Sequence, residues 1–121
     1  MNKKTWQVRK GEIYYAELTG TVGSEQSGIR PVLIVQNDVG NKHSPTTIIA
    51  SLTSQTDKPT LPTHLKLDWH FGLQKDSIVM MEQIRTIDKS RLLNYIGKLD
   101  DRTVKLVDNC LRISFGIGGD C

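Results

Sequence analysis

Short apolar runs alternate with glycine- and proline-containing turns along most of the chain, a pattern that predicts a mainly β protein. The predicted strands cover residues 11–18, 31–36, 46–54, 64–67, 77–87 and 95–99. Residues 37–45 are predicted to form a turn, and residues 88–93 a single helical turn capped by Asp88. Between the first two strands, residues 19–29 form a polar loop, and compact domains usually keep a loop of this length for a function.

The hydrophobic period changes near the C-terminus. From Asp100 onward, apolar residues recur every three or four positions, as at Val104, Val107 and Cys110, which predicts an amphipathic helix of about four turns. Asp100 or Asp101 caps its start, and the glycines that begin at Gly116 end it. We therefore expect a small, strongly bent sheet or open barrel closed by a C-terminal helix.

The length fits one domain over residues 1–121, with residues 1–8 as a flexible extension and 117–121 as a flexible tail. Sixteen Lys and Arg against thirteen Asp and Glu give a net charge of +3, which favours a polyanionic partner or merely keeps the protein in solution. Cys110 is expected in the core and Cys121 as an exposed tail thiol. No secretion signal or membrane span is visible, so a cytoplasmic protein is expected.

Several kinds of catalytic machinery are missing from the sequence. It contains no HExxH, GxSxG, P-loop or DxD pattern, so we expect no metal and no cofactor. The three histidines, His43, His64 and His70, are expected in surface or structural roles. His70 lies between Trp69 and Phe71, whose rings either stack on nucleobases or cap one end of the barrel.

Arg30 stands between the polar loop and a predicted strand, with Pro31 directly behind it. A guanidinium offers a rigid fork of donors that fits phosphate oxygens. If the strands that carry Arg30 and Thr53 are neighbours, the two side chains can grip one phosphate. Alternatively, Arg30 pairs with a carboxylate such as Glu82 or Glu12, and Thr53 is an ordinary strand residue.

Five motif blocks resemble one known family. They are KGEIYYAEL, GSEQSGIRPVLIVQND, SPTTIIASLTSQ, LPTH and SIVMMEQIRTIDKSRL, and they follow one another in the family's order over about residues 9–115. The chain thereby resembles the MazF and PemK toxin endoribonucleases, most closely the MazF proteins of Gram-positive bacteria.

The resemblance implies a homodimer of SH3-like barrels of the CcdB/PemK type that cuts single-stranded RNA at short recognition sequences without a metal. The products would be a 2',3'-cyclic phosphate and a 5'-hydroxyl. By the same motif match, Arg30 and Thr53 would be the catalytic pair. Ser24, Glu25, Gln26 and Gln83 would contact RNA; the alternative is that they are solvated loop residues. An acidic, MazE-like antitoxin would be the protein partner.

Some properties transfer poorly. Residues 68–76 follow no family pattern that can be placed residue by residue, so a UACAU-like cleavage site is only suggested. Two other functions stay open at this point. One is a CcdB-like gyrase poison, because the helix ends in Phe115-Gly116-Ile117 where gyrase poisons carry Trp-Gly-Ile. The other is an RNA-binding module without catalysis.

Overall fold

The computed structural model describes residues 7–57 and 60–118, and these residues form one antiparallel sheet with a helix at the C-terminus. The strand order is β4-β5-β3-β2-β1-β6. The strands are β1 (Glu12–Leu18), β2 (Gly28–Ile34), β3 (Thr46–Thr53), β4 (His64–Leu67), β5 (Ser77–Asp88) and β6 (Leu92–Lys98). The helical segments are α1 (Asp38–His43), η2 (Trp69–Phe71), η3 (Lys89–Arg91) and α2 (Asp101–Phe115). The predicted mainly β fold with a C-terminal helix is confirmed.

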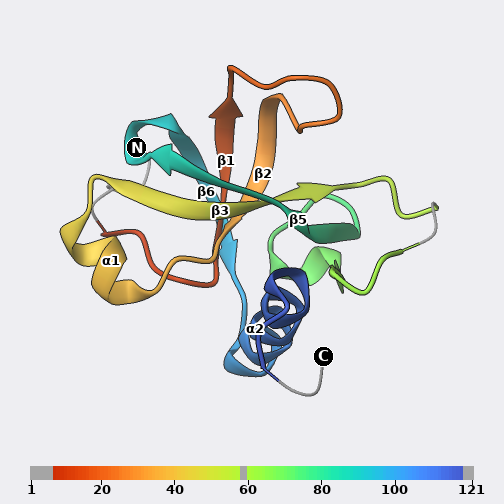
Figure 1. The fold of residues 1–121 in the computed structure, drawn as a ribbon. Helices are drawn as coiled ribbons and strands as arrows, with labels where there is room; N and C mark the ends of the chain where they lie inside the picture. The colour runs from red at the N-terminus through yellow and green to blue at the C-terminus, as the bar shows by residue number, and fades with distance from the viewer. Residues whose placement is uncertain (1–6, 58–59, 119–121) are drawn as a thin grey trace.

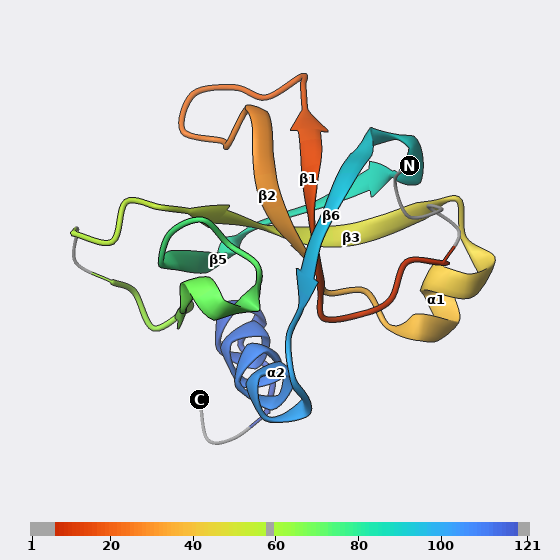
Figure 2. The same ribbon diagram turned by 180° about the vertical axis from the view of Figure 1, so that it is seen from behind.

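The sheet curls strongly. In Figure 1, β1 and β2 rise steeply while β3 and β5 run across them, and α2 lies below the crossing. From behind, β6 passes in front of β3 on its way down to α2 (Figure 2). The right-handed twist of strands accumulates into this kind of curvature. The fold is therefore a half-open barrel closed below by the helix, as the sequence pattern predicts.

Helix α2 begins and ends where the sequence indicates. The Asp100 side chain accepts a hydrogen bond from the Thr103 N–H at 2.8 Å, which caps the start. Gly116 ends the helix in the left-handed conformation, with φ of 64°. Val107 and Cys110 face the sheet and join a cluster with residues such as Leu33. The C-terminal Phe115-Gly116-Ile117 sequence thus contains the helix cap.

A second apolar cluster covers the opposite face of the sheet. Successive side chains on a strand point to opposite faces, so Leu33 packs with the helix side while Val32 and Ile34 join Tyr14 and Ile49 on the other side. All five are fully buried. Arg30 follows the same alternation as Val32 and Ile34. The arginine therefore belongs to the face that the helix does not cover.

Three elements differ from the sequence prediction. A short helix, α1, occupies the expected turn of residues 37–45, because the Asn37 side chain accepts from the Gly40 N–H at 2.8 Å and caps its start. Strand β2 begins at Gly28 rather than Pro31, since its first residues already pair with β1. Strand β6 likewise begins at Leu92, where the Asp88-capped turn ends.

The ends of the chain and the two cysteines were also predicted. Residues 1–6 and 119–121, which include Cys121, lie outside the described residues. Within the expected N-terminal extension, Val8 is buried in the second apolar cluster. Cys110 is buried and free, as expected of a core thiol. Within the described residues, no helix combines the length and apolar character that crossing a membrane requires.

Residues 68–76 pack tightly against β6 through two glycines. A Cβ atom on Gly97 would lie 1.9 Å from the Phe71 carbonyl oxygen, and one on Gly72 would lie 2.3 Å from the Ile96 oxygen. Phe71 packs on the helix-side cluster, whereas Trp69 is 65% exposed. Of the two rings expected to cap the barrel end, only Phe71 does so.

Candidate active site

The sheet divides where strands β2 and β3 stop pairing. Val32 and Ser51 form the last pair between β2 and β3. Beyond them, residues 28–31 of β2 pair only with β1, and residues 52–53 of β3 pair only with β5. The two strands diverge from this point, as both ribbon views show. Beyond this division, the side chains of β2 and β3 lack the neighbouring-strand residues that they would have in a continuous sheet.

Strand β5 also departs from regular pairing here. Ala50 pairs with Ile84, but the next residue, Ser51, pairs with Met80, so residues 81–83 have no partner on β3. Bulges of this kind bend a strand and redirect its side chains, and they are common beside active sites. The freed backbone groups of Met81 are satisfied elsewhere: its N–H donates to Thr63, and its carbonyl accepts from Ser114 of α2.

Arg30 lies on β2 just beyond this division, and its side chain is exposed. Its Nε donates to the Ser27 carbonyl at 3.0 Å, which fixes the direction of the guanidinium. The carboxylates proposed as alternative partners are engaged elsewhere: Glu82 with His64, and Glu12 with the Arg9 N–H and the Tyr14 hydroxyl. Within the described part of the chain, Arg30 forms no ion pair. Its terminal N–H groups are thus available to a ligand.

Thr53 is the last residue of β3 and is half-buried. Its hydroxyl oxygen accepts from the Gln55 N–H at 3.2 Å, so the hydroxyl proton remains free to be donated. Arg30 and Thr53 each lie two residues beyond Val32 and Ser51, the last pair that joins β2 and β3. The structure therefore places this predicted pair on two neighbouring strands and on one face, on either side of the division.

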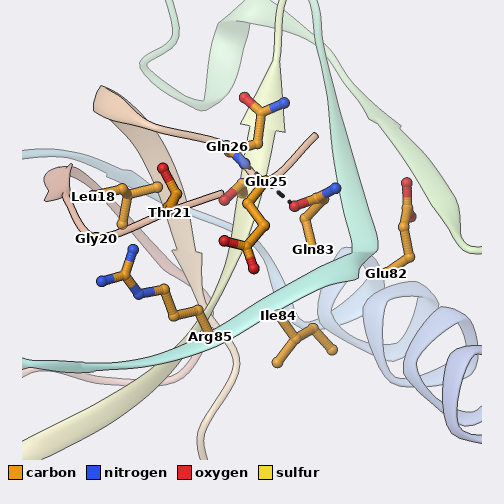
Figure 3. A pocket seen from close by; sticks show the side chains of 10 residues that line it. Leu18, Gly20, Thr21, Glu25, Gln26, Glu82, Gln83, Ile84 and Arg85 are labelled. Atoms are coloured by element: carbon orange, nitrogen blue, oxygen red, sulfur yellow. Dashed lines mark hydrogen bonds between the residues drawn. The ribbon is translucent and has the colours of Figure 1, made fainter. Parts of the chain in front are cut away.

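A cavity of about 410 Å³ adjoins the division. It lies between the loop that joins β1 to β2, the end of β1, Ser51 of β3 and the bulged part of β5 (Figure 3). Its lining includes Thr21, Glu25, Gln26, Glu82, Gln83 and Arg85. Arg30 and Thr53 do not line it. The cavity and the pair are neighbours on the sheet face, because Ser51 stands two residues before Thr53 on the same side of β3.

Three of the four predicted RNA contacts line this cavity, and the fourth, Ser24, is bonded to one of them through its backbone. Gln83 accepts from the Gln26 N–H and donates to the Ser24 carbonyl, both at 3.4 Å, so its side-chain amide holds the loop against β5. Figure 3 shows Glu25 with Gln83 on one side and Arg85 on the other. Glu25, Gln26 and Gln83 line the cavity, whereas Ser24 takes part through its backbone.

Arg85 is a cavity residue that the sequence analysis did not single out. It lies on β5 within the quoted EQIRTID block, where a charged residue between isoleucines is typical of an ordinary half-exposed strand. In the structure its Nη2 donates to the Thr19 carbonyl at 2.5 Å, which ties the same loop to β5. The sequence signal that could have identified Arg85 is its position two residues after Gln83, because residues two apart share one face of a strand.

The histidines have the predicted structural and surface roles. His64 Nδ1 accepts from the Leu61 N–H at 3.2 Å, so Nε2 carries the proton that is shared with Glu82 at 2.8 Å. Both ring nitrogens of His64 are thus occupied. His43 and His70 are exposed, and His70 Nδ1 lies 3.5 Å from Asp68. No three His, Cys, Asp or Glu side chains in residues 7–57 and 60–118 gather into a potential metal site.

Glu82 is held in its charged form beside the cavity. Partial burial by itself raises the pKa of this carboxyl, but hydrogen bonds from His64, from its own backbone and from Thr63 outweigh it. The pKa of Glu82 is therefore lowered from its ordinary value. The Thr63 hydroxyl donates to Glu82 at 2.9 Å, so the pair with His64 also anchors the segment before β4.

Comparison with known proteins identifies the family. The profile described as "PemK-like, MazF-like toxin of type II toxin-antitoxin system" matches residues 9–115. This chain belongs to that family. It is 50% identical over 111 residues to endoribonuclease EndoA of Bacillus subtilis, covering 91% of this chain and 96% of the relative. It is 47% identical over 111 residues to endoribonuclease MazF of Staphylococcus saprophyticus, covering 91% and 92%.

The fold agrees with solved structures of the same kind. A mycobacterial endoribonuclease in complex with its cognate antitoxin superimposes with a TM-score of 0.78 at 24% identity, covering 93% of this chain and 99% of that one. The predicted likeness to Gram-positive MazF proteins is thereby confirmed, as is the CcdB/PemK-type fold. The family match favours the toxin endoribonuclease over the gyrase poison.

Proposed function

We propose that this protein cuts single-stranded RNA at short recognition sequences, as the endoribonuclease of a type II toxin–antitoxin pair. The observation that supports the proposal is that Arg30 and Thr53 each lie two residues beyond the last β2–β3 pair, near a polar cavity that Ser51 lines. The family to which the chain belongs and the names of its curated relatives support an endoribonuclease. The Arg30–Thr53 assignment is our own proposal from geometry and motif.

The reaction uses a nucleophile that the substrate provides. The ribose 2'-hydroxyl loses its proton and attacks the adjacent phosphorus, and the bond to the 5'-oxygen of the next nucleotide breaks. That oxygen takes up a proton, so a 2',3'-cyclic phosphate and a 5'-hydroxyl remain. Catalysis then needs the phosphate held in line and its developing charge stabilised. Neither task requires a metal ion, and we propose that none takes part.

Arg30 and Thr53 divide that work between them. Guanidinium groups stay protonated in proteins, so we assign Arg30 the stabilisation of negative charge on the non-bridging oxygens rather than proton transfer. The free hydroxyl proton of Thr53 adds a neutral hydrogen bond to the same phosphate. Placed on two strands that diverge, the two groups approach the phosphate from different sides.

The loop between β1 and β2 supplies the contacts to bases. Single-stranded RNA is recognised through unstacked bases whose edges form hydrogen bonds with side chains. Glu25, Gln26 and Gln83 line the cavity with amide and carboxylate groups suited to this, and Ser24 lies at the loop backbone that Gln83 holds. We propose that these four residues contact the RNA.

An acidic antitoxin and a second copy of the chain complete the proposed assembly. The family is that of type II toxin–antitoxin systems, and the net charge of +3 suits an acidic partner that competes with RNA. We propose a cytoplasmic homodimer, inhibited by an acidic, MazE-like antitoxin segment lying in the RNA site. A synthetic acidic peptide from the antitoxin should slow cleavage, and sedimentation should give twice the chain mass; a monomer, or a peptide without effect, would count against these proposals.

The proposed endoribonuclease activity is tested with a long single-stranded RNA. The purified protein is incubated with it in EDTA, the cut ends are sequenced, and each 3' end is tested for a cyclic phosphate, which blocks ligation until it is opened and the remaining phosphate is removed. We expect discrete cuts, resistance to EDTA, cyclic phosphates and free 5'-hydroxyls. Cuts that require added divalent metal, or that leave 5'-phosphates, would overturn the proposed chemistry.

A further inference from the structure

The exposed residue Lys66 lies in the same cross-strand row as Thr53. Residues that pair directly across antiparallel strands point to the same face of a sheet. Ile78 of β5 pairs with Thr53 of β3 on one side and with Lys66 of β4 on the other. Two strand spacings, roughly 10 Å, therefore separate the backbones of Lys66 and Thr53. Lys66 is a cation close to Thr53 and on the same face of the sheet.

The burial pattern of β4 agrees with this placement. Leu65 and Leu67 pack in the helix-side cluster, whereas Lys66, between them, is exposed. His64 shares the face of Lys66, and its ring bonds at 2.8 Å to Glu82, which lines the cavity. The outward face of β4 thus continues the surface that carries the cavity and the proposed catalytic pair.

The fold itself does not use the charge of Lys66. Among residues 7–57 and 60–118, no ion pair involves this lysine. The carboxylates just beyond the ends of β4 and β5 have other partners: Asp68 lies 3.5 Å from His70 Nδ1, and Asp76 accepts from the Trp69 N–H at 3.1 Å. The ammonium group of Lys66 is therefore available to an anion from outside the chain.

The proposed function supplies such an anion in the RNA backbone. Lysine binds phosphate as a point charge, and contacts to backbone phosphates position a nucleic acid without reading its sequence. An RNA whose scissile phosphate is held by Arg30 and Thr53 carries a further phosphate on each side of it. Ile78, which separates Thr53 from Lys66, is buried and apolar, so the next group along this row that can bind a phosphate is Lys66.

We infer that Lys66 binds a backbone phosphate next to the scissile one and so directs the RNA from the catalytic pair across β5 to β4. This rests on the proposed function, because the scissile phosphate is the one assigned to Arg30 and Thr53. The contact adds affinity for every RNA sequence equally. It does not touch the reacting atoms, so the rate of cleavage of bound RNA does not depend on it.

A simpler interpretation is that Lys66 is a solvated lysine that acts only through the net charge, and the chain contains a matched control for it. Lys105 is also exposed, but it lies on α2, which covers the other face of the sheet. Lys105→Gln therefore removes the same charge without removing a group from the proposed RNA surface. Lys66→Arg is the second control, because it keeps a cation that binds phosphate at the same position.

The first test measures RNA affinity against salt concentration for the wild type, Lys66→Gln, Lys66→Arg and Lys105→Gln. The RNA is single-stranded and carries 2'-O-methyl groups, which remove the nucleophile and prevent cutting. One lost phosphate contact should lower the slope of log affinity against log salt by about 0.7 in Lys66→Gln. The other two variants should keep the wild-type slope. An unchanged slope in Lys66→Gln, or an equal fall in Lys105→Gln, would overturn the inference.

The second test locates the phosphate. Once the wild type has shown where it cuts, single phosphates around that position in the uncut RNA are replaced one at a time by an uncharged methylphosphonate. At one phosphate next to the scissile one, the replacement should weaken binding by the wild type but not by Lys66→Gln, because the variant has already lost that contact. Equal sensitivity of the two proteins at both flanking phosphates would contradict the inference.

Binding and cleavage together separate this inference from the proposed function. If the wild type binds RNA but never cuts it, and the salt slope falls only in Lys66→Gln, the RNA contact of Lys66 stands and the nuclease proposal fails. If the wild type cuts, but Lys66→Gln keeps both the slope and the wild-type response to methylphosphonates, the nuclease stands and the contact is wrong. A slower single-turnover rate of Lys66→Gln at saturating protein would show that Lys66 acts on the chemical step instead.

Discussion

Arg30 on β2 and Thr53 on β3 each lie two residues beyond Val32 and Ser51, the last pair that joins the two strands. Strand β2 continues with β1 and strand β3 continues with β5, so the two residues stand on either side of a dividing sheet. In a continuous sheet they would be ordinary cross-strand neighbours. We propose that the guanidinium of Arg30 and the hydroxyl of Thr53 bind one phosphate across this division.

Replacing Thr53 by valine should reduce the rate of RNA cleavage by about a hundredfold or more while leaving the fold intact. Valine keeps the shape and the strand preference but loses the hydroxyl that donates to the phosphate. It also loses the acceptor for the Gln55 N–H, so Thr53→Ser, which keeps both functions, is the control. Single-turnover cleavage rates decide: equal rates for Thr53→Val and Thr53→Ser would show that the hydroxyl has no catalytic part.

Gly97→Ala should destabilise the protein by about 3 kcal/mol, which is near the upper end of the range that is usual for overpacked core sites. The added Cβ would lie 1.9 Å from the Phe71 carbonyl, a backbone atom that cannot move without separating η2 from β6. Gly116→Ala provides the comparison. There the added Cβ meets open space and only the φ of 64° opposes it, so we expect a loss nearer 1 kcal/mol. Urea denaturation measures both, and a smaller loss for Gly97→Ala would contradict the packing described.

Glu82→Gln should make the protein less stable at neutral pH, and the difference should shrink as the solution becomes acidic. Because the pKa of Glu82 in the folded protein lies below its ordinary 4.5, the charged carboxylate stabilises the fold above that pH. This contribution is lost as the pH falls through the folded value. Thermal unfolding from pH 7 to pH 3 should therefore show the two melting temperatures converging below about pH 4.5.

The control for this measurement is Glu17→Gln, an exposed carboxylate on β1. Its melting temperature should follow that of the wild type at each pH. Asp88 and Asp100 also have a lowered pKa, caused first by hydrogen bonds from Ser90 and Thr103 respectively. The wild type and both variants keep these two residues, so all three proteins should lose some stability in acid. A constant gap between wild type and Glu82→Gln from pH 7 to pH 3 would show that the charge of Glu82 is not what stabilises the site.

The elements predicted correctly are those whose signals are local. Strand β3 is an apolar run bounded by turns, and α2 has a capping aspartate, a three-to-four-residue period and a terminal glycine. Helix α1 was missed because its six residues carry no apolar period. It depends instead on the Asn37 cap and on buried Asn41, which bonds to the Gln36 carbonyl and the Thr47 hydroxyl.

The geometry of the site depends on contacts between distant parts of the chain. The sequence indicated Arg30 and Thr53 as a pair only on the condition that their strands are neighbours, and the pairing of β2 with β3 meets that condition. The three-residue bulge of β5 carries no local signal, because it arises from register with β3. Arg85 was missed for the same reason: only the folded loop shows that it faces a cavity.

The most direct test of the account is to measure RNA cleavage and RNA binding separately for the wild type, Arg30→Ala and Arg30→Lys. The Arg30 side chain is exposed, and among the described residues its only hydrogen bond is to the Ser27 carbonyl, so neither change should unfold the protein. We predict that Arg30→Ala cleaves at least about a hundredfold more slowly in a single turnover, with a much smaller loss of binding, and that Arg30→Lys lies between. A cleavage loss no larger than the binding loss would instead mean that Arg30 only binds RNA and that the catalytic groups lie elsewhere.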